Sequence, residues 1–496
     1  MGGVWDSIAV VGLAVVGLIG VVGLEAQARP RGVGLARRSS ADHLMLIGAW
    51  LLMDGVLVLI LARSGLALVS GSAVLAGLLI VNNTKEALLR EPLLFDDYDY
   101  LVDALRHPRL FWPYIGTTRV IGSGLAVAAV LTFGGWMEPS WAPRSTALSV
   151  ALVGFALLFG GYARDRRWQP PGVSEAPRQA VRRRGLFASL LVNLLRALIR
   201  CRATPTMPDH TAQLPRRTPM SATPDRQRHR IAVQSESFLD PRRRMPGVNP
   251  GMLPHFDRLR QSGHSGSLSV PAFGANTVRT EHAFLSGYPS RMLGDWRFNP
   301  YRHIRHGQLN GSWVKGLRAQ GYHTICVHPY VASFYARDRV MPLLGFDEFV
   351  DINAFEPGDG QALAGISPYV SDAAVADWVI QRLNENEAPL FIFVITMESH
   401  GPYPPEAESA TYLKHLANAD DMLGRLADAL CGNPRGGQLC WYGDHPPILP
   451  QAWSRHGYPG RWTDYLLWSS AGQQSIAPPP LHSVTPDTLG RWFAGQ

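Results

Sequence analysis

Apolar runs in the first third of the chain constrain its fold most, because each approaches the length that crosses a lipid bilayer. A helix needs about 20 apolar residues to span the hydrocarbon core. The runs are Ile8–Leu24, Leu44–Ala62, Leu66–Val81, Val120–Trp136 and Thr146–Gly160. No basic segment precedes the first run and four more follow it, so a retained span is favoured over a signal peptide. The sequence predicts an α-helical membrane domain of about five spans over residues 1–163.

A basic segment follows the last apolar run, over residues 164–229. Between Arg164 and Arg230 there are fifteen arginines, no lysine and four acidic residues, an excess of charge larger than the +8 of the whole chain. Within it, Gly185–Ile199 is an apolar stretch flanked by arginine, which predicts a helix on the membrane surface against anionic headgroups. A helix packed on the soluble domain is the alternative. Contact with anionic lipid headgroups accounts for this positive charge, so nucleic-acid binding is not needed to explain it. By the positive-inside rule alone, the C-terminal half would lie in the cytoplasm.

Residues 230–496 alternate between strand-length apolar runs and helical patterns. The strand-like runs are Ile231–Gln234, Thr324–Val327, Leu390–Thr396 and Gln438–Tyr442. The helical patterns between them are Asn310–Gln320, Tyr369–Leu383 and Ala407–Leu430. This alternation is typical of an α/β domain with a mainly parallel central sheet that helices cover on both faces. In such folds, ligands bind beyond the carboxyl ends of the strands.

Metal-type and hydroxyl side chains follow these predicted strands. Glu236 ends the first run, Asp444 and His445 end the last, and Thr277 lies in the glycine-containing turn that begins at Phe273. Two carboxylates, an imidazole and a hydroxyl suit one divalent ion, and Mn²⁺, Mg²⁺ and Zn²⁺ are all compatible. A metal-bound hydroxyl loses its proton more easily. Thr277 is therefore a candidate nucleophile toward a phosphoester, giving a covalent phosphothreonine.

Further polar residues near the predicted strand ends could hold the phosphate. Arg337 offers a bidentate fork to phosphate oxygens. His328 and His400 can donate hydrogen bonds or act as acid and base. For Arg337, a surface ion pair with Asp338 or Asp347 is the alternative.

Two other assignments stay open at this point. Thr277 could be a helix N-cap rather than a nucleophile, and Thr280 competes with it for the same role. Cys431 and Cys440 could form a disulfide if this half lies outside the cytosol, or remain free thiols.

Several motifs occur in a fixed order along the chain. They are Glu236–Phe238, Gly274–Glu281, His328 followed by Ser333–Asp338 and Gly345–Phe349, Ser399–Tyr403, and Gly443–His445. In this order they resemble the lipoteichoic acid synthase family, the membrane phosphoglycerol transferases of the alkaline phosphatase/sulfatase superfamily. In the membrane half, the segment from Lys85 to Asp96 resembles the loop that these enzymes carry between their third and fourth spans.

The resemblance implies the roles of individual residues. It implies one divalent ion, Mn²⁺ before Mg²⁺ or Zn²⁺, held by Glu236, Thr277, Asp444 and His445, with Thr277 as the nucleophile. It also implies that His328, Arg337 and His400 hold the glycerophosphate group. Tyr335 stands where the family often has tryptophan, so packing around the headgroup differs here.

The resemblance further implies the reaction and its location. It implies transfer of a phosphoglycerol group from phosphatidylglycerol to a cell-envelope glycan or polymer. The protein would be a multi-pass protein of the plasma (inner) membrane, with the domain 230–496 on the extracytoplasmic, periplasmic side despite the arginine content. The Arg-rich, Lys-poor composition favours a Gram-negative envelope and hence a periplasmic or capsular glycan.

Other functions remain as alternatives. Phosphoethanolamine transfer uses a similar nucleophile and similar spans. A sulfatase or phosphodiesterase-type hydrolase is less favoured, since Thr277 does not lie in the Cys/Ser-x-Pro-x-Arg context of sulfatases. A catalytically inactive scaffold or lipid-binding module would be marked by loss of a metal ligand, and all four candidate ligands are present.

Overall fold

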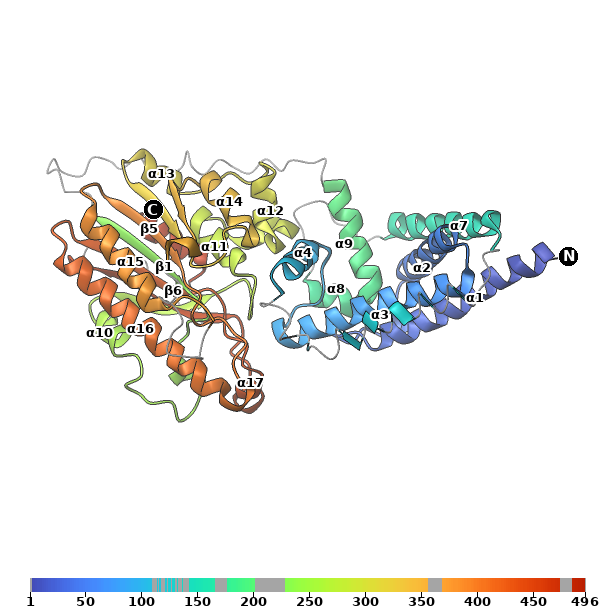
Figure 1. Cartoon of the computed structure of the whole chain (residues 1–496), viewed down its shortest axis with the longest axis horizontal. Coiled ribbons are helices and arrows are strands. Elements are labelled where there is room, and N and C mark those ends of the chain that lie inside the picture. Colours follow the sequence, from blue (N-terminus) through green and yellow to red (C-terminus); the bar gives the residue numbers. More distant parts are fainter. Residues whose placement is uncertain are drawn as a thin grey trace. The chain divides into compact units, whose positions relative to one another are not determined.

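A computed structural model describes residues 2–108, 142–165, 176–200, 228–355, 368–472 and 484–495, with isolated positions between 114 and 136. The chain divides into two compact units, Met1–Thr204 and Pro205–Gln496 (Figure 1). Most of the predicted linker 164–229 falls outside the described residues. Its boundaries therefore stay a prediction.

The first unit contains helices that are long and apolar enough to cross a membrane. Among the described residues they are α1 (Gly2–Ala26), α2 (Ser40–Leu61), α3 (Ser64–Leu89) and α7 (Arg144–Arg164). They contain four of the five predicted runs. The remaining run, Val120–Trp136, lies largely outside the described residues. The protein is thus a multi-span membrane protein.

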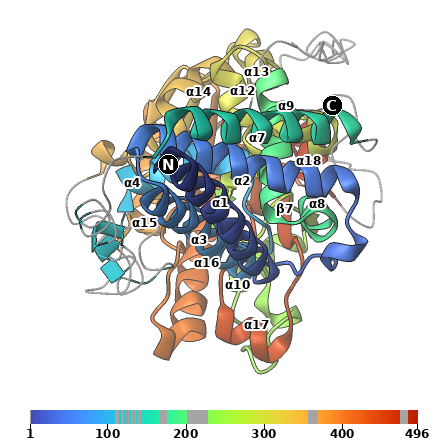
Figure 2. The same cartoon turned by 90° about the vertical axis from the view of Figure 1, so that its right-hand side faces the viewer.

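Helices α2 and α7 lie side by side and antiparallel, in contact through facing glycines (Figure 2). A Cβ added to Gly154 would lie 2.3 Å from the backbone nitrogen of Leu52, and one added to Gly48 would lie 2.4 Å from the backbone nitrogen of Leu158. In lipid there is no hydrophobic force between helices, so close backbone approach through small residues supplies much of their association.

A leucine at position 154 is therefore expected to separate these helices. Its side chain would occupy the space of the α2 backbone, and overpacking of this kind costs about 2 kcal/mol or more. Thermal unfolding in detergent should show a midpoint several degrees lower for Gly154→Leu, on the scale of about 2–4 °C per kcal/mol for a unit of this size. Gly160→Leu is the matched control, because a Cβ on Gly160 in the same helix meets nothing within 4 Å. Equal midpoints for the two variants would refute this packing.

Charged side chains gather at one end of the helices, where α1, α3 and α7 end and α2 begins. Two shorter helices, α8 (Pro177–Arg184) and α9 (Leu186–Arg200), are attached to this end. Ion pairs there include Arg38–Glu25 (2.8 Å), Lys85–Asp97 (2.6 Å), Arg178–Glu86 (2.6 Å) and Arg184–Asp165. The Glu25 carboxylate also accepts the backbone N–H of Phe187 at 3.1 Å. The described residues 176–200 of the basic segment are therefore fixed to the ends of the spans.

The second unit is built on a seven-stranded sheet with the order β2-β7-β6-β1-β5-β3-β4. The strands are β1 (His229–Ser235), β2 (His264–Ser269), β3 (His323–Val327), β4 (Glu348–Val350), β5 (Leu390–Ile395), β6 (Gly437–Gly443) and β7 (Trp462–Ser469). Only β7 runs against the others in this sheet. The prediction of a mainly parallel sheet is confirmed, and the four predicted strands are β1, β3, β5 and β6.

Helices cover both faces of the sheet (Figure 1). One face packs on α10 (Pro254–Arg260), α15 (Asp372–Glu385), α16 (Glu408–Gly432) and α17 (Pro450–His456). The other packs on α11 (Thr277–Ser286), α12 (Pro300–Arg305), α13 (Val314–Ala319), α14 (Arg337–Leu344) and α18 (Pro486–Ala494). Along β1, Ile231 and Val233 belong to the first core and Ala232 to the second. Alternate side chains point to opposite faces, so a strand buried on both must be apolar throughout.

The alternative prediction of a disulfide between Cys431 and Cys440 is wrong. Both cysteines are free. Cys440 lies on β6 in the core that packs on α11–α14, whereas Cys431 belongs to α16 on the opposite face. The sheet itself separates the two sulfur atoms.

Candidate active site

The carboxyl ends of four parallel strands bring the predicted site residues to one edge of the sheet. Glu236 follows β1, His328 follows β3, His400 lies five residues beyond β5, and Asp444 and His445 follow β6. In parallel α/β sheets this edge is where ligands bind.

Three of these residues form a compact group of metal-ligand type. Ligand atoms of Glu236, Asp444 and His445 lie within 4.8 Å of one another, and all three residues are buried. The His445 Nε2 atom is 3.1 Å from Asp444 Oδ2 and 3.8 Å from Glu236 Oε1. These separations allow one divalent cation to reach all three side chains.

The surroundings orient each ligand toward a common point. Asp444 Oδ1 accepts the backbone N–H groups of Ser237 and His445, both at 2.9 Å, and Oδ2 has no hydrogen-bond partner among the described residues. The Nδ1 atom of His445 lies 3.3 Å from the carbonyl oxygen of Pro446, which favours the proton on Nδ1 and a lone pair on Nε2. The Ser237 hydroxyl donates to Glu236 Oε1 at 2.8 Å. Buried acceptors that converge, with one carboxylate oxygen left without a donor among the described residues, fit a cation.

This environment disfavours the charged form of Glu236 when no cation is bound. Burial, and next the charge of Asp444, raise the pKa of Glu236 to about 8. A metal ligand must be deprotonated, so binding displaces this proton. Metal affinity should therefore rise with pH up to about 8 and then level off, because above that pH the carboxyl is already ionised.

Titration calorimetry of the metal-free protein with Mn²⁺ can check this expectation. At about pH 7, in buffers of different ionisation enthalpy, we expect release of close to one proton per ion bound. Binding without proton release, and with equal affinity at about pH 6 and pH 8, would contradict the raised pKa of Glu236.

Thr277 begins helix α11, next to the ligand group. The N-cap position belongs to Asn276, with a φ of 65°, and no side-chain hydrogen bond caps the helix. The alternative that Thr277 is itself the N-cap is therefore wrong. Two hydrogen bonds brace this segment against the metal-ligand loop: Gly274 N–H donates to the Pro446 carbonyl at 3.1 Å, and the Thr280 hydroxyl donates to the Asp444 carbonyl at 2.8 Å.

The same contacts distinguish Thr277 from Thr280. Thr280 is fully buried and its hydroxyl is engaged on the Asp444 carbonyl. Thr277 is partly exposed, on the helix turn between the two bracing contacts. These positions favour Thr277 as the reactive hydroxyl and give Thr280 the task of holding the loop.

Arg337 lies in the interior rather than on the surface. It is 1% exposed, its Nε donates to Glu281 Oε2 at 3.1 Å, and Nη2 pairs with the other Glu281 oxygen. Its Nη1 lies 3.0 Å from His328 Nε2. The expected alternative, a surface ion pair with Asp338 or Asp347, is wrong.

Glu281 is the functional candidate that sequence reasoning missed. It is fully buried, accepts two hydrogen bonds from one edge of the Arg337 guanidinium, and accepts the Tyr301 hydroxyl at 2.6 Å. The spacing was the available signal, because Glu281 stands four residues after Thr277 on one helix and therefore on the same face. Its carboxylate fixes the position of the Arg337 guanidinium.

His328 and His400 differ in whether a ring nitrogen remains available for a substrate. Both ring nitrogens of His328 are engaged, Nδ1 with the Ile395 carbonyl at 3.2 Å and Nε2 with Arg337. Burial, and next the charge of Arg337, hold the pKa of His328 well below its usual value, so the ring is neutral. His400 uses Nδ1, which lies 2.6 Å from the Gly401 carbonyl, and Nε2 is the nitrogen left for a substrate.

Backbone strain marks the same places. Among the described residues of the second unit, the non-glycine residues with positive φ are Ser237, Asn276, Tyr335 and Ala336. Ser237 follows Glu236, Asn276 precedes Thr277, and the pair Tyr335–Ala336 precedes Arg337. The Tyr335 ring lies 5.0 Å from the Arg337 guanidinium. Left-handed conformations of such residues cost about 1–3 kcal/mol each and cluster at functional sites.

The fold and the site define a membrane-bound α/β protein whose buried Glu/Asp/His group could bind a metal ion. The chain belongs to the sulfatase family, whose family model matches residues 228–487, just over half of the chain. The sulfatase-like fold expected from the sequence is thereby confirmed.

Two curated relatives come from Rhizobium meliloti (strain 1021). The chain is 35% identical to the capsular polysaccharide biosynthesis protein RkpI over 271 residues, which cover 52% of this chain and 48% of that protein. It is 27% identical over 423 residues to a protein named "Putative cyclic beta-1,2-glucan modification protein", covering 76% of this chain and 63% of that one. The chain thus spans about half of the first relative and less than two thirds of the second.

A solved structure is similar over both units. It is the integral membrane protein lipooligosaccharide phosphoethanolamine transferase A from Neisseria meningitidis, with a TM-score of 0.55 and 12% identity, covering 98% of this chain and 93% of that one. At this identity the likeness shows the fold alone.

Proposed function

We propose that the protein is a transferase that moves a phosphoglycerol group from phosphatidylglycerol to a cell-envelope glycan through a phosphothreonine on Thr277. One observation carries the proposal. Three buried ligands, Glu236, Asp444 and His445, converge beside a partly exposed hydroxyl whose helix is braced against the same loop. Within this group, the Oδ2 atom of Asp444 has no hydrogen-bond partner among the described residues. A divalent ion at these residues, Mn²⁺ by the resemblance, supplies the charge that lowers the pKa of that hydroxyl and offsets negative charge on phosphate.

In the first half of the reaction, the Thr277 oxygen forms a bond to the phosphorus of the lipid. The bond from phosphorus to the diacylglycerol oxygen breaks, and that oxygen takes a proton. His400 is the better carrier of this proton, since both nitrogens of His328 are engaged by protein groups. The Nε2 atom of His400 accepts the Thr277 hydroxyl proton and passes it to the diacylglycerol oxygen. Arg337, fixed by Glu281, places positive charge where phosphate oxygens need it.

In the second half, a glycan hydroxyl attacks the phosphothreonine. Its proton passes through the same histidine to the Thr277 oxygen, which leaves as the new phosphodiester forms. Water in place of the glycan would give a hydrolase of the same family. Transfer therefore requires that the acceptor be bound when the intermediate is present.

The headgroup is proposed from the site motifs. His328 with Arg337, and Ser399–Tyr403, resemble the phosphoglycerol transferases. Burial lowers the pKa of His400, so its ring is neutral, and the Tyr369 hydroxyl lies 3.4 Å from its Nδ1. Neutral hydrogen-bonding groups of this kind suit glycerol hydroxyls. Phosphoethanolamine transfer is the alternative that the experiment below separates.

The acceptor and the location are proposed from the relatives and the fold. The names of the two relatives point to a capsular polysaccharide and a cyclic glucan. We therefore place the catalytic unit on the periplasmic side of the inner membrane, where envelope glycans are modified. The arginines of α8 would then contact anionic headgroups on that side.

Donor-labelled lipids can test the proposal. Full-length protein in vesicles, with Mn²⁺ and an oligoglucan, should move label from glycerol-labelled phosphatidylglycerol to the glucan and leave diacylglycerol. Label moved only from phosphatidylethanolamine would replace the proposed donor. Label released as free glycerol phosphate at the same rate with and without glucan would replace transfer by hydrolysis.

Removing the charge of Glu281 should weaken catalysis without removing a ligand. Glu281→Gln keeps the shape but loses the charge and one of the two oxygens that hold the Arg337 guanidinium. Weakening of such an outer partner typically costs about 10–100-fold in activity. The rate constant kcat/KM for the lipid donor should fall by that amount. Glu348→Gln, which breaks the Arg382–Glu348 pair (2.7 Å) at β4, is the control and should leave kcat/KM unchanged. Equal rates in both variants would show that Arg337 needs no such support.

A further inference from the structure

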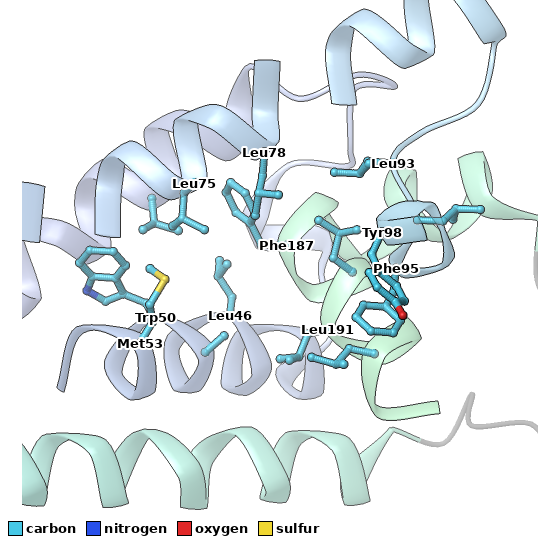
Figure 3. Close-up of a pocket in the computed structure, with 15 residues that line it drawn as sticks. Leu46, Trp50, Met53, Leu75, Leu78, Leu93, Phe95, Tyr98, Phe187 and Leu191 are labelled. Carbon is cyan, nitrogen blue, oxygen red and sulfur yellow. The ribbon is translucent and has the colours of Figure 1, made fainter. Parts of the chain in front are cut away.

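The membrane unit contains a partly open apolar cavity of about 380 Å³ (Figure 3). Its walls come from α1, α2, α3, α9 and the segment 93–98. Leu75 and Leu78 of α3, Leu46 of α2, and Phe187 and Leu191 of α9 point into it (Figure 3).

The lining offers almost nothing to water. Of its fifteen residues, only Trp50 and Tyr98 carry a side-chain nitrogen or oxygen. The indole N–H of Trp50 is already used, because it donates to the Ala14 carbonyl at 2.7 Å. Apolar cavities of this kind stay dry and take up hydrocarbon. Within membrane-spanning helices, the available hydrocarbon is the acyl chain of a lipid.

Positive charge lies beside this cavity. Helix α8 carries Arg178 and Arg182–Arg184, and its Val181 packs in the same apolar cluster as Leu75 and Phe187. Arg178 is held on Glu86, two turns beyond Leu78 on α3, and Arg184 is held on Asp165. Arg182 is exposed, and no ion pair is seen for it in the described part of the chain. A lipid with its tail in the cavity would therefore meet arginines at its headgroup, which favours an anionic lipid.

We propose that this cavity binds one acyl chain of the anionic glycerophospholipid donor, with the arginines of α8 beside its phosphate. That this lipid is the donor of the reaction rests on the proposed function. The binding site itself rests on the cavity, its dry lining and the adjacent basic helix. The site would select a diacyl lipid with a long chain before its headgroup reaches the chemistry.

Photolabelling tests the site without requiring turnover. The probe is phosphatidylglycerol with a diazirine in the middle of one acyl chain, in vesicles that contain the full-length protein. After irradiation, mass spectrometry should find label on cavity residues of α2, α3 and α9. Label confined to outward-facing residues such as Val74 and Ile80, which are 53% and 42% exposed, would overturn the proposal.

Filling the cavity supplies a matched comparison. Leu78→Trp with Leu191→Trp places two indoles inside, and close packing then leaves little room for a chain, so labelling should fall at least about fivefold. Ile80→Trp with Leu198→Trp adds the same side chains on outward faces of the same helices and should not change it. Equal labelling of the cavity-filling variant and the outward-facing control variant would contradict the proposal. If the filled variant does not fold, the map of labelled residues in the natural protein still decides.

Competition separates this proposal from the proposed function. Unlabelled phosphatidylglycerol should reduce cavity labelling, whereas phosphatidylcholine of the same chain length should not. Equal competition by both lipids would show an unselective groove and overturn a donor site. If phosphatidylglycerol competes selectively but no phosphoglycerol is ever transferred, the lipid site stands and the proposed reaction falls.

Discussion

Replacing Thr277 by alanine is expected to reduce transfer by roughly 10⁴-fold or more, because no other group would then form the covalent bond to phosphorus. The fold should be unaffected, since Asn276 rather than Thr277 occupies the N-cap position of α11. Initial rates of diacylglycerol formation from phosphatidylglycerol measure the effect. Thr277→Ser, which keeps a hydroxyl, should retain part of the activity.

Thr280 provides the control for this prediction. Thr280→Ser keeps the hydroxyl that donates to the Asp444 carbonyl. Its rate of transfer should therefore stay within a few-fold of that of the natural protein. If Thr277→Ala turned over normally and Thr280→Ser were inactive, the two threonines would have to exchange roles.

Replacing Asp444 by asparagine is expected to produce the second largest effect. Asparagine can keep an oxygen at the Oδ1 position, which accepts the N–H groups of Ser237 and His445. It loses the charge and the Oδ2 oxygen that has no hydrogen-bond partner among the described residues. We expect Mn²⁺ affinity to fall by about 10²-fold or more and transfer by roughly 10³-fold, as for loss of a charged ligand beside the reacting phosphate.

Asp420→Asn is the matched control for this second prediction. Asp420 is also fully buried, but its carboxylate accepts the backbone N–H groups of His255 and Phe256 at the start of α10. This variant should lower the unfolding midpoint and leave Mn²⁺ affinity unchanged. Calorimetric binding and thermal unfolding measured on both proteins decide the matter. Unchanged Mn²⁺ affinity in Asp444→Asn would remove Asp444 from the metal site.

The sequence predicted the parts of the fold whose signal is local. β1, β3, β5 and β6 are buried on both faces, so they appear as continuous apolar runs. β2 and β4 are edge strands, one rich in serine and the other three residues long, and neither has such a pattern. β7 begins with the polar segment Trp462–Asp464, which hides its apolar second half.

The site was predictable where a residue follows a strand, and less so where it depends on a partner. Glu236, Asp444 and His445 follow their strands directly, and parallel strands must bring them together. Arg337 could be named, but its surroundings could not, because the buried contact with Glu281 joins residues 56 positions apart. The glycine contact between α2 and α7 and the cavity beside α9 also depend on residues far apart in the sequence. No local sequence pattern could therefore predict them.

The central claim is a covalent phosphoglycerol group on Thr277, and a rapid-quench mass measurement tests it most directly. The full-length protein would be mixed with phosphatidylglycerol and Mn²⁺ without a glycan acceptor, quenched in acid, digested, and analysed for the peptide that carries Thr277. We predict the mass of that peptide plus a glycerophosphoryl group, lost when the metal is chelated and absent from Thr277→Ala. An unmodified peptide under conditions where diacylglycerol is still formed would contradict the account, because the headgroup would then leave without bonding to Thr277.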